Sequence, residues 1–118
     1  MNLPHQEPLV FAKKVLKANK EEVEVLCLFK ETPTLAMFIE ASAQSSVAFN
    51  EENAPSIGFI SIVKNIELKE KIIELEYRIQ VKKEAEIGAY KQFYFEAYAL
   101  KSQVKSVTGF FTLVMQSF

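Results

Sequence analysis

Apolar and polar residues alternate along much of this chain, and a period of two is the pattern of half-buried β-strands. The clearest run extends from Ile73 to Val81, where every second residue is apolar and the residues between are charged or polar. A second run, residues 22–29, places Val23, Val25, Cys27 and Phe29 on one face. Less regular apolar segments predict further strands over residues 9–16, 57–68, 88–100 and 104–115. The charged residues at 69–71 and 82–86 are expected to connect strands.

A helical period interrupts the strands once, over residues 33–49. Thr32 is the expected N-cap, and Pro33 suits the first helical position because proline has no amide hydrogen to leave unsatisfied. Pro55 is the expected stop. Between these points, apolar and small residues recur at helical spacing, namely Leu35, Phe38, Ile39, Ser42, Ala43, Ser46 and Val47.

The predicted order is therefore two strands, one helix and four strands. The pattern lacks the strand–helix alternation of a doubly wound parallel sheet. A single long helix can cover the apolar concave face of one strongly curved antiparallel sheet. We therefore predict that residues 1–118 form a single α+β domain with the hotdog fold, in which about six antiparallel strands wrap around one long central helix.

Two features of the late strands bear on the interior. In residues 88–100, three tyrosines (Tyr90, Tyr94 and Tyr98) share one face, while Phe93, Phe95, Ala97 and Ala99 share the other. The many aromatic residues suit either ordinary core packing or the walls of a tunnel for an acyl chain. Gly109 lies within the last strand and is a candidate bulge or point of close approach.

Composition excludes several function classes. The formal net charge of −1 argues against a nucleic-acid partner, because phosphate recognition usually needs a basic excess. The lone Cys27 cannot form an internal disulfide and is expected in the core. One histidine leaves too few ligands for a metal site, and no cofactor is implied. No signal peptide pattern and no apolar run of about 18 residues are present, so we expect a soluble cytoplasmic protein without a membrane span.

The residue that stands out chemically is Glu40, a carboxylate in the middle of an otherwise apolar helix. Glutamate is almost never fully buried without a partner. On the inward side of such a helix it would be paired, face a cavity, or take part in chemistry. A relic carboxylate held by a lysine, backbone amides or water is the alternative to a functional role.

Two stretches resemble a known enzyme family. Residues 3–11, LPHQEPLVF, followed by Lys14-Val15-Leu16, resemble the "LPHRYPFLLVDRVL" opening of FabZ-type 3-hydroxyacyl-acyl carrier protein dehydratases. Residues 38–44, FIEASAQ, resemble the "IEAMAQ" motif of that family's central helix, and residues 57–60 resemble its glycine-containing strand at Gly58. The ApeP-like relatives, with an "LPH" opening and an "IELMAQ" helix, are similar in style.

The resemblance implies a site shared across a dimer, with the helix glutamate of one subunit facing a histidine of the other. Glu40 corresponds to that glutamate, and Gln44 is its neighbour one turn on. The family's histidine belongs to a "GHFPxxPxxPG" loop before the helix, and this chain has only residues 30–34, KETPT, in that interval. Thr32 and Thr34 can offer hydroxyl groups there, but neither is a base at neutral pH.

His5 matches the "LPH" histidine, which marks the entry to the first strand and is not the usual catalytic one. It is either held by hydrogen bonds near that strand or serves as a substitute base facing Glu40 across a dimer interface. The implied ligand is an acyl thioester of acyl carrier protein or coenzyme A. The implied assembly is a homodimer, or a heterodimer with a related hotdog subunit.

Three functions follow from this resemblance. The first is dehydration of a 3-hydroxyacyl thioester, as in fatty acid or polyene metabolism, which needs a base for the α-proton and an acid for the leaving hydroxide. The second is thioester hydrolysis with Glu40 and a water molecule. The third is non-catalytic, an acyl-binding protein or the partner subunit of a histidine-bearing homologue.

Overall fold

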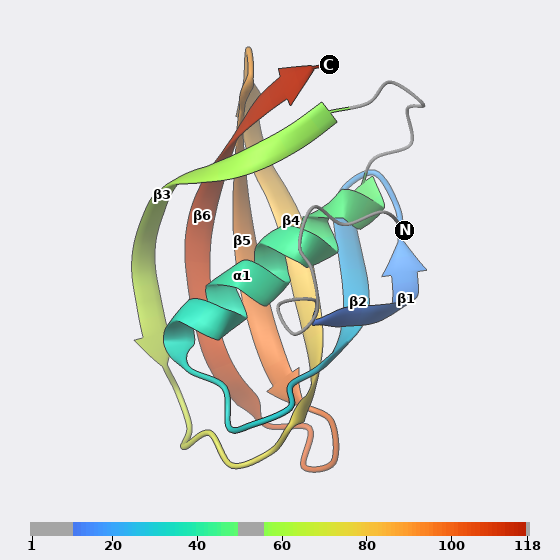
Figure 1. Ribbon diagram of the computed structural model, residues 1–118, viewed down its shortest axis with the longest axis vertical. Helices are drawn as coiled ribbons and strands as arrows, with labels where there is room; N and C mark the ends of the chain where they lie inside the picture. Colours follow the sequence, from blue (N-terminus) through green and yellow to red (C-terminus); the bar gives the residue numbers. More distant parts are fainter. Residues whose placement is uncertain (1–10, 50–55, 118) are drawn as a thin grey trace.

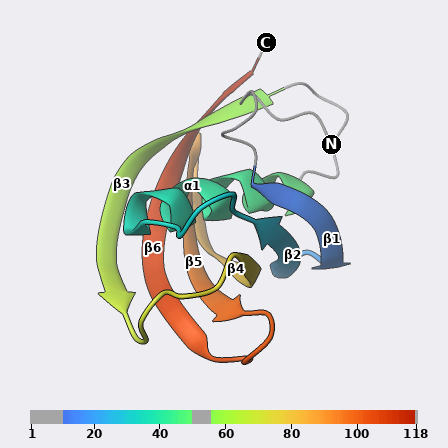
Figure 2. The same cartoon turned by 60° about the horizontal axis from the view of Figure 1, so that its bottom comes forward.

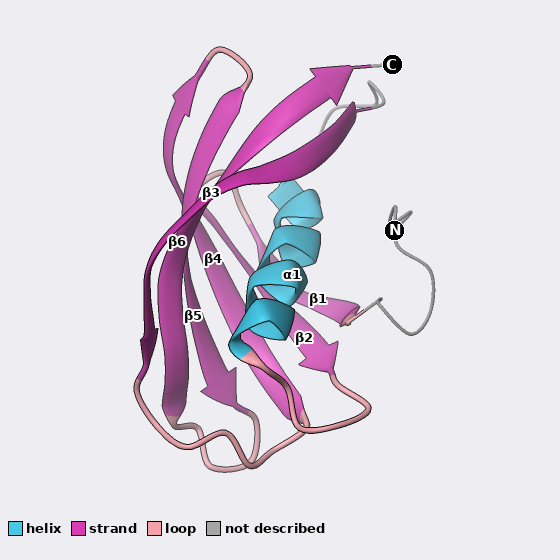
Figure 3. Cartoon of the chain, turned by 60° about the vertical axis from the view of Figure 1, so that its left-hand side comes forward, coloured by secondary structure: helices cyan, strands magenta, loops and turns pink. Residues whose placement is uncertain are grey.

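The computed structural model describes residues 11–49 and 56–117, which form one six-stranded antiparallel sheet curled around one helix (Figure 1). The strand order across the sheet is β1-β2-β4-β5-β6-β3, so β1 and β3 are the two edges. Figure 3 shows the helix lying across the concave side of the sheet. The elements are β1 (Ala12–Ala18), β2 (Glu22–Leu28), α1 (Leu35–Ser45), the short 3-10 helix η1 (Ser46–Phe49), β3 (Ser56–Leu68), β4 (Glu76–Ile87), β5 (Tyr90–Ala99) and β6 (Lys105–Ser117).

The core lies between the concave face of the sheet and α1. The alternating residues of β2, β4 and β5 bury one face each, as the sequence predicts, and Cys27 is fully buried. Phe38 on α1 makes an edge-to-face contact with Tyr77 on β4, with ring centroids 4.8 Å apart. Phe29 packs on both of these rings. These rings fix the first turns of the helix against the middle of the sheet.

The helix begins two residues later than the sequence predicts. Its N-cap is Thr34, not Thr32, and the Thr34 hydroxyl accepts a hydrogen bond from the Met37 backbone N–H at 3.2 Å. Pro33 is buried ahead of the first helical residue, Leu35. Both threonines suit an N-cap, and the structure uses Thr34, whose hydroxyl bonds the Met37 N–H, so Pro33 precedes the cap.

The β4–β5 hairpin is also longer than predicted. Residues 82–86 were expected to be a connection, but they pair with β5 as far as Ile87↔Tyr90. β4 begins at Glu76, so residues 73–75 of the predicted strand lie outside it. The hairpin continues past the end of β2, where β4 is solvated on more sides, and charged residues are stable there without ending the strand.

The convex face of the sheet carries part of the predicted tyrosine stripe. Tyr94 and Tyr98 both donate hydrogen bonds to Glu96, at 3.0 and 2.9 Å, and Lys105 pairs with the same carboxylate at 2.9 Å. Partial burial raises the pKa of Glu96, but the hydrogen bonds from Lys105, Tyr98 and Tyr94 outweigh that effect and hold its pKa below its usual value. The polar groups of these four side chains therefore bond to one another on the side of the sheet that faces away from α1.

Candidate functional site

Glu40 lies in the middle of α1, on the side of the helix that points away from the core. The buried side of the helix is formed by Phe38, Ala41, Ser42 and Ser45. Residues that are three or four positions apart share one side of a helix, and these four residues share the side that meets the sheet. Glu40 lies on the other side and is partly exposed. The sequence left the orientation of this carboxylate open, and the structure puts it on the face of α1 that the sheet does not cover.

Gln44 follows Glu40 by one turn but serves a structural role in this chain. Its side chain is buried, and Oε1 accepts hydrogen bonds from the backbone N–H groups of Phe11 and Ala12, at 2.8 and 3.3 Å. The amide thereby ties α1 to the start of β1. Its carbonyl oxygen is thus used within the fold.

The start of α1 carries the two threonines. The Thr34 hydroxyl is occupied as the helix cap, and the Met37 sulfur accepts in turn from the Thr34 backbone N–H at 3.5 Å. Thr32 is exposed in the segment before the cap. The segment from residue 30 to residue 34 contains no histidine. The chain's only histidine, His5, lies outside the described residues.

Gly58 lies on the edge strand β3, opposite Met115 of β6. A Cβ atom at this glycine would stand 2.9 Å from the Met115 sulfur and 3.1 Å from Cδ1 of Leu113. The absence of a side chain lets these two residues approach β3 closely. The structure therefore places Glu40 and Gln44 on α1, Thr34 at its N-cap and Gly58 on the edge strand β3.

The edge strand β3 adds residues that the sequence analysis did not single out. Ile60 and Val63 point to the concave side, opposite Leu113 and Phe111, yet they are 37% and 40% exposed. Phe59 and Ile62 point to the convex side and are about half exposed. The signal in the sequence was the nearly continuous apolar run over 57–63, which places apolar residues on both faces of the strand.

The flank of α1 that faces β3 carries Leu35 and Ile39. Gln44 binds β1 from the opposite flank, so the Leu35–Ile39 flank lies toward the other edge of the sheet. Figure 2 shows β3 curving past this side of the helix. Leu35 is exposed and Ile39 is partly buried. Apolar side chains are thus partly exposed both on this flank of α1 and on the concave side of β3.

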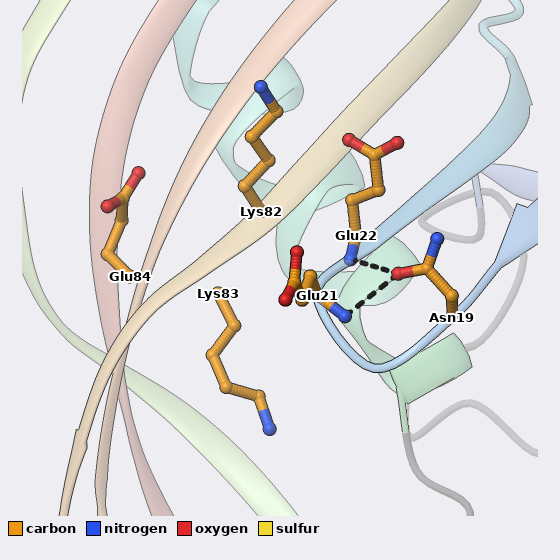
Figure 4. Close-up of a pocket in the computed structure, with 6 residues that line it drawn as sticks. All are labelled: Asn19, Glu21, Glu22, Lys82, Lys83 and Glu84. Carbon is orange, nitrogen blue, oxygen red and sulfur yellow. Dashed lines mark hydrogen bonds between the residues drawn. The ribbon is translucent and has the colours of Figure 1, made fainter.

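A polar depression lies elsewhere, where the β1–β2 turn meets β4 (Figure 4). Asn19 Oδ1 accepts hydrogen bonds from the backbone N–H groups of Glu21 and Glu22, at 2.8 and 2.9 Å. Lys82 and Lys83 point to opposite sides of β4. The two lysines therefore do not converge on one point.

In residues 11–49 and 56–117, no group of three His, Cys, Asp or Glu side chains is placed to hold a metal ion. Over the same residues, no helix has the length and apolar character needed to cross a membrane. The Cys27 thiol is not a candidate nucleophile, because burial raises its pKa to about 12.

Comparisons with known proteins identify the fold. No protein-family model matches the chain, and no curated protein matches it in sequence. Among solved structures, a chain of the dehydratase heterocomplex ApeI:P from Xenorhabdus doucetiae superposes with a TM-score of 0.74 at 16% identity, over 97% of this chain and 88% of the other. A hypothetical thioesterase with coenzyme A from Streptococcus pneumoniae superposes with a TM-score of 0.65 at 10% identity, over 88% and 85%.

A thioesterase from Haemophilus influenzae superposes with a TM-score of 0.63 at 8% identity, over 87% of this chain and 77% of the other. Identities this low establish shared architecture and carry no residue-level equivalence. The element order, the curled antiparallel sheet and the enclosed helix agree with the prediction from the sequence. The chain has the hotdog fold.

Proposed function

We propose that this chain is one subunit of a hotdog dimer that acts on acyl thioesters, with Glu40 as its acid–base group. The observation that carries the proposal is the position of Glu40, a partly exposed carboxylate on the face of the central helix that the chain's own sheet leaves uncovered. A carboxylate in this place, beside an apolar surface on α1 and β3, suits a substrate with a polar head and an apolar tail.

The reaction that fits best is removal of water from a 3-hydroxyacyl thioester. A base takes the proton from the α-carbon, the C–O bond at the β-carbon breaks, and an acid protonates the departing hydroxide to give water and the 2,3-unsaturated thioester. Glu40 supplies one of the two groups. Residues 30–34 contain no histidine, so a partner's histidine is proposed to supply the second group.

The second subunit is proposed to bind along β3. The opposite edge, β1, carries Lys13, Lys14 and Lys17, and charged side chains on an edge strand discourage pairing with another strand. β3 instead exposes apolar side chains on both of its faces between its two bulges. The partner is either a second copy of this chain or a related hotdog chain, and only the latter brings a catalytic-loop histidine.

The decisive experiment compares turnover by this chain alone with turnover after mixing it with a histidine-bearing hotdog homologue. Substrates are 3-hydroxyacyl thioesters of acyl carrier protein and of coenzyme A, and water loss is followed by the absorbance of the unsaturated thioester. Glu40→Gln should lower the rate by about a hundredfold or more, the usual weight of a general acid or base. Glu70→Gln, which changes an exposed loop glutamate, is the matched control and should leave the rate unchanged.

The possible outcomes separate the functions. Equal rates for the wild type and Glu40→Gln would remove Glu40 from the chemistry. Release of free thiol from plain acyl thioesters, lost in Glu40→Gln, would assign thioester hydrolysis in place of dehydration. Saturable acyl-thioester binding without turnover in any mixture would reject a catalytic subunit and leave an acyl-binding protein.

The proposed interface has its own test. Ile62→Lys places a charge on the convex side of β3, and Val15→Lys makes a similar change on β1 at a residue that is also exposed. Sedimentation velocity should show that Ile62→Lys weakens association and that Val15→Lys does not. The reverse result would place the partner on β1 and contradict the proposal.

A further inference from the structure

The edge strand β3 contains a bulge that alters the concave face of the sheet. Lys64 pairs with Phe110 and Glu67 pairs with Thr108, so two residues of β3, Asn65 and Ile66, stand opposite the single residue Gly109 of β6. Asn65 has a positive φ of 53°, a conformation that Asn tolerates better than most residues. Such a bulge redirects the side chain that follows it.

The side chain that the bulge redirects is Ile66. A Cβ atom added to Gly109 would lie 2.1 Å from Cδ1 of Ile66 and 3.1 Å from Cε1 of Phe95. Ile66 therefore fills the place of a side chain at position 109, on a strand inside the sheet. The chain needs glycine at this point because the neighbouring strand supplies the packing atom.

This arrangement ends an apolar strip on the concave side of β3. The strip begins at Gly58, which presents no side chain, and continues with the exposed residues Ile60 and Val63. Beyond Val63 the inserted Ile66 packs against the core. At about 3.3 Å per residue, the strip from residue 58 to residue 63 is about 16 Å long.

We propose that Ile66 limits the length of the acyl chain that this concave strip accepts. The proposal rests on the proposed function, in which the thioester lies near Glu40 and its apolar tail follows the surface from α1 to β3. A tail in contact with Ile60 and Val63 gains from each methylene that leaves water. Ile66 stops that gain, because its Cδ1 atom occupies the space over Gly109 into which a longer tail would extend.

Two variants open this space to different extents. Ile66→Val removes Cδ1, the atom over Gly109, with little effect expected on folding. Ile66→Ala removes more of the side chain. Adding Gly109→Ala to Ile66→Ala returns a methyl group to the opened space from the other strand. Ile73→Ala, at an exposed apolar residue outside the strands, is the matched control.

The measurement is calorimetric affinity for saturated acyl-coenzyme A thioesters that differ by two-carbon steps, using the assembled protein after a thermal melt confirms folding. Affinity of the wild type should rise with length and then stop rising. Ile66→Val and Ile66→Ala should move that limit to longer chains, with about a tenfold gain for two further buried methylenes. Gly109→Ala in the Ile66→Ala background should move it back, and Ile73→Ala should behave as the wild type.

The outcomes for the length limit and for the proposed function are distinct. Acyl-thioester binding with the same length limit in the wild type and both Ile66 variants would overturn the role of Ile66 and leave the proposed function standing. A limit displaced equally by Ile73→Ala would also overturn it, because the effect would then be general. Absence of acyl-thioester binding by the folded wild type would overturn both.

Discussion

Replacing Gln44 by methionine tests whether the central helix holds the first strand through this one side chain. Gln44 is buried, and its Oε1 atom accepts from the Phe11 N–H at 2.8 Å and from the Ala12 N–H at 3.3 Å. Methionine has a similar length and no strong acceptor. The change therefore keeps the packing volume while it removes the acceptor for two backbone donors.

The expected loss of stability follows from the shorter of the two hydrogen bonds. A buried donor that loses its partner costs about 1–3 kcal/mol, whereas the longer contact to Ala12 contributes less. We therefore expect Gln44→Met to lower the free energy of unfolding by about 2 kcal/mol. For a domain of this size that corresponds to a fall in the melting temperature of roughly 6–10 °C.

The assay is urea unfolding followed by circular dichroism, at one fixed protein concentration because association would shift the apparent stability. Gln116→Met, which changes an exposed glutamine near the end of β6, is the control and should alter the unfolding free energy by less than about 0.5 kcal/mol. Equal unfolding free energies for Gln44→Met and Gln116→Met would refute the reasoning. Gln44 would then not be the residue that secures β1 to the helix.

Three further results are expected. Gly88→Ala should destabilise the fold by about 1 kcal/mol in urea unfolding, because Gly88 has a φ of +59° and a Cβ there meets no neighbour, so only backbone strain is added. Glu96 has a lowered pKa in the folded state, so its contribution to stability is present above the pKa of the unfolded chain and is lost as pH falls through the folded value. Glu96→Gln should therefore flatten the decline of unfolding free energy below about pH 5, and an unchanged decline would contradict this. Cys27, with its pKa raised to about 12 by burial, should not react with a thiol reagent at pH 8 until the protein is unfolded, and fast reaction of the native protein would show that the core opens.

Most of the fold was predictable because its strands are half buried. In β4 and β5, solvent on one side and the helix on the other impose a strict alternation, and the buried residues Tyr77, Ile79, Phe93 and Phe95 follow it. Element ends were harder to predict. The β4–β5 hairpin passes beyond β2 with charged residues in its strands, and such residues resemble a turn when only the sequence is read.

The candidate site was predictable in composition but not in orientation. Glu40 stands out as a carboxylate in an apolar helix, yet the side of the helix that meets the sheet is lined partly by Ala41, Ser42 and Ser45. Small residues carry little hydrophobic signal, so the pattern did not fix which face is buried. The hydrogen bonds from the start of β1 to Gln44 could not be predicted either. Every residue except proline has a backbone N–H group, so the sequence of β1 does not show which of these groups bonds to a side chain.

The β3 edge and Glu40 should act as one unit if the proposed function is right. While the Glu40 face of α1 is partly open to water, the water screens the carboxylate and weakens its effect on a developing charge. A subunit bound along β3 would exclude water and bring the second titrating group, so each feature depends on the other. Ile62→Lys and Glu40→Gln should then be strongly non-additive in turnover by the mixture with the histidine-bearing homologue, with the double variant hardly slower than the slower single variant. Losses that multiply, measured at saturating substrate with every variant shown to be folded, would mean that Glu40 acts without the partner and that β3 serves another purpose.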